Sequence, residues 1–166
     1  MKIILSLLIL FSACKSGMQK DHLSFKDFEP MQGNWFGIQM VLFNDDSTGF
    51  NYPSKVTVAL LKDSVEINMT NTYADGHQET EKGILSINKN GSILSLGASE
   101  YDVKDVIRTK DELAIFAYKE GEDNDRPATI RLQIVIRAKV MAVFKHIKYD
   151  GSEDYFTRIS LSLSKK

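Results

Sequence analysis

The sequence predicts an all-β domain of eight to ten antiparallel strands, arranged as an up-and-down meander. From Gly33 onward, apolar and polar residues alternate with a period of two, and helical periodicity is nearly absent. Turn-forming pairs such as Asn90-Gly91 and Asp150-Gly151 separate these alternating runs. Consecutive hairpins can close into a barrel without exposed edges, so a barrel is favoured and a β-sandwich is the alternative.

The clearest strand covers residues 65–73, where Val65, Ile67, Met69 and Tyr73 share one face. Residues 129–149 contain no turn former near their middle, so they form either two strands or one long bent strand. The longest expected loops are residues 44–54 and 120–127, which are rich in turn formers. The expected strands are residues 34–43, 55–61, 65–73, 83–87, 92–96, 101–108, 113–118, 129–137, 140–149 and 155–163.

The N-terminus has the layout of a secretory signal peptide. Lys2 is followed by an uncharged apolar stretch over residues 3–11, which is too short to cross a bilayer as a helix. The stretch ends in Ser12-Ala13-Cys14, which resembles the lipobox of bacterial lipoproteins, although Phe11 replaces the preferred Leu. The resemblance implies cleavage before Cys14 and a diacylglycerol group on its thiol. An ordinary signal peptide with a chance cysteine is the alternative.

The domain boundaries follow from this motif. Residues 1–13 form the cleaved signal peptide, residues 14–31 the lipidated cysteine and its tether, and residues 32–166 a single β-barrel domain. Within the tether, Leu23, Phe25 and Phe28 predict a short segment packed on the domain, with one helical turn capped by Ser24 and closed by Pro30.

Charge and cysteine content limit the partners. Cys14 is the single cysteine, so no internal disulfide can form. A net charge of −1 gives no electrostatic case for binding nucleic acid. We expect a monomer that contacts the membrane through its lipid anchor alone. The location would be the cell envelope, on the inner or outer membrane, with the domain in the periplasm or at the cell surface.

The first strand opens with Gly33-Asn34-Trp35, and this Gly-x-Trp tripeptide at the start of a meander resembles the lipocalins and the wider calycin group. In that group the Trp closes one end of the barrel, and an Arg or Lys from the last strand region packs across it. The resemblance implies that Arg158 makes this cation–π contact with Trp35. The last strand is also similar to that of fatty-acid-binding proteins, but Ser160 stands where their carboxylate-binding Tyr is expected.

A catalytic or metal site is not indicated. His22, His77 and His146 lack metal-ligand spacing, no nucleophile elbow or phosphate-binding loop is found, and we expect neither a cofactor nor an enzyme. The acidic residues 120–125 offer oxygen ligands for Ca²⁺, but an EF-hand pattern is absent, so a solvated hairpin tip is favoured.

Two functions stay open. The first is a cell-envelope binding protein that holds a small apolar or amphipathic ligand inside the barrel, although the same inward side chains could simply fill a core. The second is a protein-interaction lipoprotein, an assembly accessory or enzyme inhibitor, with a filled barrel that acts through its loops. An interior cavity above about 300 Å³ favours the first. The loop 44–54 is expected at the open end, opposite Trp35. The candidate ligand-binding residues are Phe36, Met40, Phe50, Tyr52, Met69, Tyr73 and Phe116.

Overall fold

The computed structural model describes residues 22–43 and 48–165. Within them, ten strands follow a single 3₁₀ helix. The elements are η1 (Phe25–Met31), β1 (Gly33–Leu42), β2 (Gly49–Leu60), β3 (Val65–Thr72), β4 (Gln78–Ile87), β5 (Ile93–Leu96), β6 (Ser99–Arg108), β7 (Glu112–Asp123), β8 (Arg126–Arg137), β9 (Val140–Tyr149) and β10 (Phe156–Lys165).

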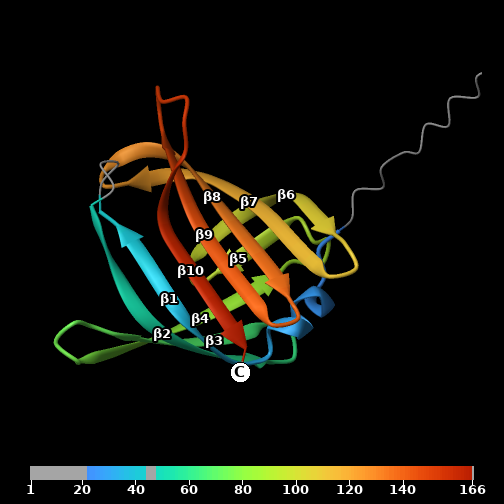
Figure 1. The fold of residues 1–166 in the computed structure, drawn as a ribbon. Helices are drawn as coiled ribbons and strands as arrows, with labels where there is room; N and C mark the ends of the chain where they lie inside the picture. Colours follow the sequence, from blue (N-terminus) through green and yellow to red (C-terminus); the bar gives the residue numbers. More distant parts are fainter. Residues whose placement is uncertain (1–21, 44–47, 166) are drawn as a thin grey trace, which may run out of the picture.

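The strands form a closed antiparallel barrel in which each strand pairs with its sequence neighbours and β1 pairs with β10 (Figure 1). The up-and-down meander is therefore confirmed, and the sandwich alternative is wrong. Strands β8 and β9 are separate, joined near Ala138 and Lys139, so the single bent strand is also excluded.

The predicted loop 44–54 is largely strand. β1 continues to Leu42, and β2 pairs with it from Gly49 to Val58 in spite of the turn formers Gly49 and Pro53. Residues 44–47 lie outside the described part of the chain. The hairpin tip is shorter than the predicted loop 120–127. β7 extends to Asp123, so the turn to β8 consists of two residues, Asn124 and Asp125. Both turn residues have positive φ, as a type I′ hairpin requires.

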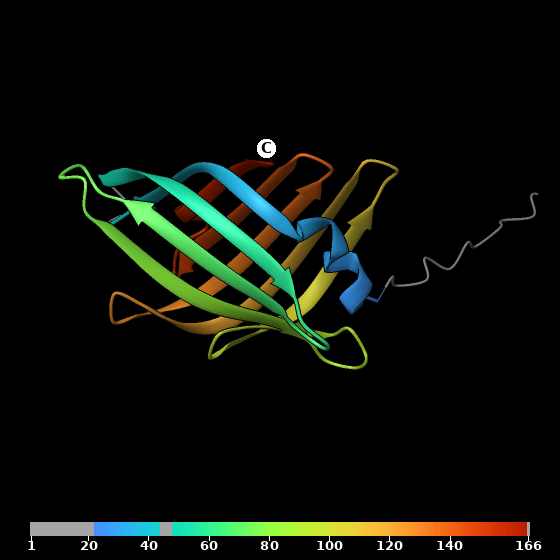
Figure 2. The same cartoon turned by 90° about the horizontal axis from the view of Figure 1, so that it is seen from below.

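Helix η1 lies across one end of the barrel, as the two views in Figures 1 and 2 show. Its Phe28 and Met31 are buried against the barrel core, and the Ser24 N–H donates to the Asp27 carboxylate at 2.7 Å. Pro30 lies inside the helix and does not end it. Arg108 of β6 ties η1 to the wall, since its Nη2 donates to Asp27 Oδ2 at 2.8 Å. Burial opposes ionisation of Asp27, but the hydrogen bonds from Arg108 and Ser24 outweigh it and lower its pKa.

Candidate ligand-binding site

Trp35 forms the floor of the barrel. Its side chain is 0% exposed, and its indole N–H donates to the Met31 carbonyl of η1 at 2.6 Å. The register pairs Trp35 with Lys165, whose Nζ lies 5.1 Å from the indole ring. Gly33 has φ +126, a backbone conformation that residues with a side chain rarely adopt, which explains why glycine precedes the Trp by two residues.

The predicted contact between Trp35 and Arg158 is wrong. Arg158 precedes Lys165 by seven residues on β10, or about 23 Å of extended strand, so it lies near the other end of the barrel. The basic residue over the indole is Lys165. The sequence showed an Arg in the last strand, but the pairing of β1 with β10 decided which cation reaches the floor.

Arg158 instead belongs to a buried polar cluster of Asp123, Tyr149 and Arg158. Its guanidinium donates to both Asp123 oxygens, to the Tyr149 hydroxyl at 2.9 Å and, through Nη1, to the Leu42 carbonyl at 2.8 Å. The Tyr149 hydroxyl donates to Asp123 at 2.8 Å. Burial opposes ionisation of Asp123, but hydrogen bonds from Arg158 and Tyr149 outweigh it and lower its pKa. The cluster links β1, β7, β9 and β10 above the barrel interior.

Between this cluster and the Trp35 floor lies a cavity of about 360 Å³. Most of its wall is apolar, and polar side chains enter it at a few positions. Near β4 and β5 the wall includes the exposed residues Glu81, Lys82 and Gly97, so the cavity reaches the surface there. In the described chain β5 pairs with β4 at Leu85–Ile87 alone, which leaves the preceding part of β4 without a strand on that side. The apolar wall includes Met31, Met69, Leu132, Ile134, Val143 and Leu161, and the polar positions include Gln39, Tyr101 and Lys145.

Three predicted ligand residues face away from this cavity. Because side chains alternate along a strand, the inward Trp35 and Gln39 put Phe36 and Met40 on the outer face, beside Ile38, which is 55% exposed. Phe116 likewise alternates with the buried Ile115 and Ala117 of β7 and faces outward. The outward position of Phe36 could have been predicted from the sequence. Adjacent residues of one strand cannot both face inward, and Trp35 was already expected to face inward.

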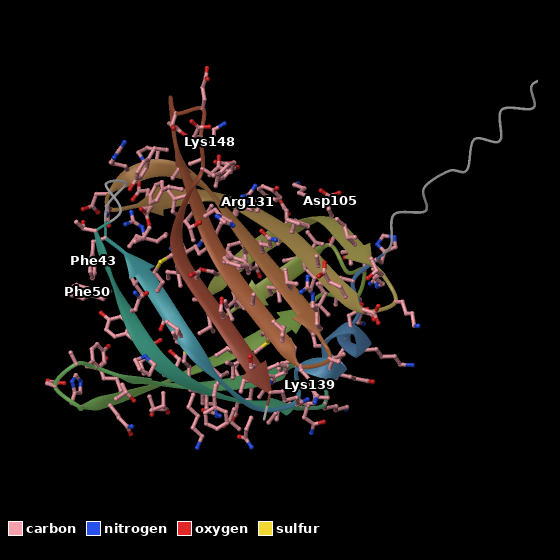
Figure 3. The ribbon with its side chains drawn as sticks, viewed as in Figure 1. Phe43, Phe50, Asp105, Arg131, Lys139 and Lys148 are labelled. Carbon is pink, nitrogen blue, oxygen red and sulfur yellow. The ribbon has the colours of Figure 1, made fainter. Side chains whose placement is uncertain are left out.

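Met69 does line the cavity, whereas Phe50, Tyr52 and Tyr73 are outside its lining and belong to a row of aromatic rings that we call the aromatic rim. This row runs from the end of β1 to the end of β3: Phe43 to Phe50 at 5.1 Å, Phe50 to Tyr52 at 6.3 Å and Tyr52 to Tyr73 at 4.8 Å between centroids. Figure 3 shows Phe43 and Phe50 at the end of the barrel away from η1. Tyr52 pairs with the cavity residue Gln39, so the row lies next to the cavity.

Polar groups hold the end of this row. Tyr73 stacks on His77 at 4.4 Å, and its hydroxyl donates to Glu79 at 2.7 Å. The hydrogen bond to Glu79 raises the pKa of Tyr73 to about 12. His77 is bonded to Asp75, which raises the pKa of the imidazole. The rim therefore carries apolar rings with carboxylates on the β3–β4 side.

Among the described residues, no group of three or more His, Cys, Asp or Glu side chains is arranged to hold a metal ion. In that same part of the chain, no helix is long and apolar enough to span a bilayer. Cys14 and the predicted signal peptide lie outside the described residues, so the lipid anchor stays a prediction.

No protein-family model and no curated protein matches the chain. Among solved structures it is similar to Rv2717c from M. tuberculosis, with a TM-score of 0.62 and 14% identity over 88% of this chain and 99% of that one. Lobster apocrustacyanin A1 gives a TM-score of 0.42 at 14% identity, over 82% of this chain and 61% of that one. Apocrustacyanin C2 gives 0.44 at 13% identity, over 85% and 63%. At 14% identity the likeness to Rv2717c concerns the fold alone, which is a closed antiparallel up-and-down barrel as the sequence predicted.

Proposed function

We propose that this protein is a lipid-anchored binding protein of the cell envelope that holds a small apolar or amphipathic ligand inside its barrel. The cavity carries this proposal. Its volume of about 360 Å³ lies within the range of small-molecule sites, and its wall is largely apolar with few polar groups. A filled barrel would have favoured the interaction lipoprotein, so the cavity favours ligand binding over that alternative.

A cavity-filling variant tests the proposal. Val143→Phe places a larger side chain in the wall, and Ala142→Phe is the matched control because Ala142 faces outward on the same strand. The neutral dye N-phenyl-1-naphthylamine should fluoresce when it enters the wild-type cavity. We expect Val143→Phe to weaken dye binding by about tenfold or more and Ala142→Phe to leave it unchanged. Absence of dye binding by the wild type, or equal binding by Val143→Phe, contradicts the proposal.

The aromatic rim supplies a second test. Phe50 is 57% exposed and lies next to Tyr52 in the row, so removal of either ring should cost less than about 1 kcal/mol of stability. Under the proposal, Phe50→Ala and Tyr52→Ala weaken dye binding. Thermal melts that show a large loss of stability with binding intact would make the row a structural lid.

The anchor is tested separately. Metabolic labelling with a fatty-acid analogue should label the wild-type protein and leave Cys14→Ser unlabelled. Label retained on Cys14→Ser would reject the lipoprotein assignment without affecting the cavity.

A further inference from the structure

The inside of the barrel has a surplus of positive charge on one wall. Lys145, Lys119 and Arg158 all point inward from β9, β7 and β10, and Asp123 is the carboxylate among them. Asp123 is already engaged by Arg158 and Tyr149. Formal charges at this wall therefore add to about +2 beside an otherwise apolar cavity.

Two lysines line the cavity, Lys82 and Lys145; Lys82 is paired with Glu66, so Lys145 is the lining cation that belongs to this wall. Its Nζ lies 3.9 Å from Asp123 Oδ1, beyond hydrogen-bond distance, and its side chain is 30% exposed. Burial lowers the pKa of Lys145; Asp123 opposes this shift, while the positive charges of Lys119 and Arg158 add to it. The ammonium is thus partly buried, and its charge is only partly balanced by Asp123.

Lys119 supports the same region. Its Nζ donates to Ser99 Oγ at 2.9 Å and lies 5.1 Å from the ring of Tyr101, which also lines the cavity. Glu81 is the carboxylate in the cavity wall, but it is exposed on β4, five strands from β9 and therefore on the opposite side of the ring.

The cavity has a polar and an apolar end. On β9, the next inward residue from Lys145 toward the Trp35 floor is Val143. It pairs with Ile134 of β8 and Leu161 of β10, and all three line the cavity. Away from the floor lies the cluster of Asp123, Tyr149 and Arg158. A ligand with a charged head and an apolar body would match this order.

Resting on the proposed function, we propose that the ligand is amphipathic with a single anionic head, a carboxylate or a group of the same charge. Lys145 pairs with the head, Lys119 adds a second positive charge nearby, and the apolar body lies toward Leu161 and Met31. An anionic head here offsets the positive charge of Lys145 and Lys119 that Asp123 does not neutralise. A charge-assisted contact in such a place is among the stronger polar interactions of a binding site.

Displacement of N-phenyl-1-naphthylamine by three probes that share a ten-carbon chain tests this: sodium decanoate, decanol and decyltrimethylammonium. We expect decanoate to displace the dye from the wild type and decyltrimethylammonium to do so poorly. Lys145→Met should weaken decanoate binding by about tenfold or more and change decanol binding by less than about twofold. Lys145→Arg should retain the preference for decanoate. Lys148→Met is the matched control, since Lys148 lies on the outer face of the same strand (Figure 3).

Unchanged decanoate affinity in Lys145→Met, or displacement by decyltrimethylammonium as good as by decanoate, overturns the anionic ligand. If the dye and decanol bind normally in that case, the proposed function stands without it. If the wild type binds neither the dye nor any probe, the proposed function itself fails. Melting curves of each variant ensure that lost binding is not lost folding.

Discussion

Replacing Arg158 with Met should strongly destabilise the barrel without disturbing its Trp35 floor. The guanidinium bonds to Asp123, Tyr149 and the Leu42 carbonyl, and the Arg158 and Asp123 side chains are each 8% exposed. Removing one partner of a buried pair leaves the other charge uncompensated and costs about 3–5 kcal/mol. Lys145, at 3.9 Å from Asp123, can balance part of that charge, so we expect the lower part of this range.

Urea unfolding followed by tryptophan fluorescence measures this loss, because Trp35 is the single tryptophan. Lys165→Met is the control at the floor: it removes the cation beside the indole, should cost about 1 kcal/mol and should change the native Trp35 emission. The double variant Asp123→Asn with Arg158→Met should lose less than the two single variants added together, by at least about 1 kcal/mol.

Two results would refute this reasoning. One is a stability of Arg158→Met within about 1 kcal/mol of the wild type, which would deny the buried pair its role. The other is a change of native Trp35 emission in Arg158→Met that Lys165→Met does not show. That result would indicate that Arg158 contacts Trp35, and it would contradict the pairing of β1 with β10.

Three further predictions concern pH and backbone packing. Asp27 and Asp123 have pKa values below the ordinary 3.8 in the folded state, so the unfolded chain takes up more protons on acidification. The stability that they contribute is present above about pH 4 and is lost as the pH falls through the lowered values; urea midpoints that stay flat down to about pH 2 would contradict this. In NMR titrations His77 should have its midpoint above pH 6.5, because it is hydrogen-bonded to Asp75. His146 should have its midpoint below pH 6.5, because it is partly buried. The reverse order of the two midpoints would be inconsistent with both environments. Gly37→Ala should lower the stability of the barrel by about 1–3 kcal/mol or more, because a Cβ would lie 1.9 Å from the Ser162 carbonyl oxygen of β10. The control is Gly83→Ala on β4, where a Cβ meets nothing nearer than 4.0 Å. Equal melting temperatures for these two glycine variants would show that β10 can move away.

Much of the fold follows from local sequence patterns and could be predicted from them. The period-two alternation and the hairpin turns specify antiparallel strands in sequence order, and the Gly-x-Trp tripeptide marks where the first strand begins. Leu23, Phe25 and Phe28 correctly predicted a short segment packed on the domain. Trp35 also fixed the inward face of β1, so the outward position of Phe36 and Met40 was present in the sequence although the prediction placed them inside.

The candidate site depends on pairing between distant strands, which alternation cannot specify. A bulge between Thr157 and Ile159 reverses which face of β10 points inward, so Phe156 and Ile159 both pair with inward residues of β9, and Arg158 is left to meet Asp123. The register of β1 with β10 sets Lys165, not Arg158, beside Trp35. The same ring of pairings turns Lys145 into the cavity. The sequence by itself determined the class of fold and the closed end of the barrel, because strands and turns follow from neighbouring residues. Only the tertiary structure decided which cations line the interior, because register and bulges are set by contacts between segments far apart in the chain.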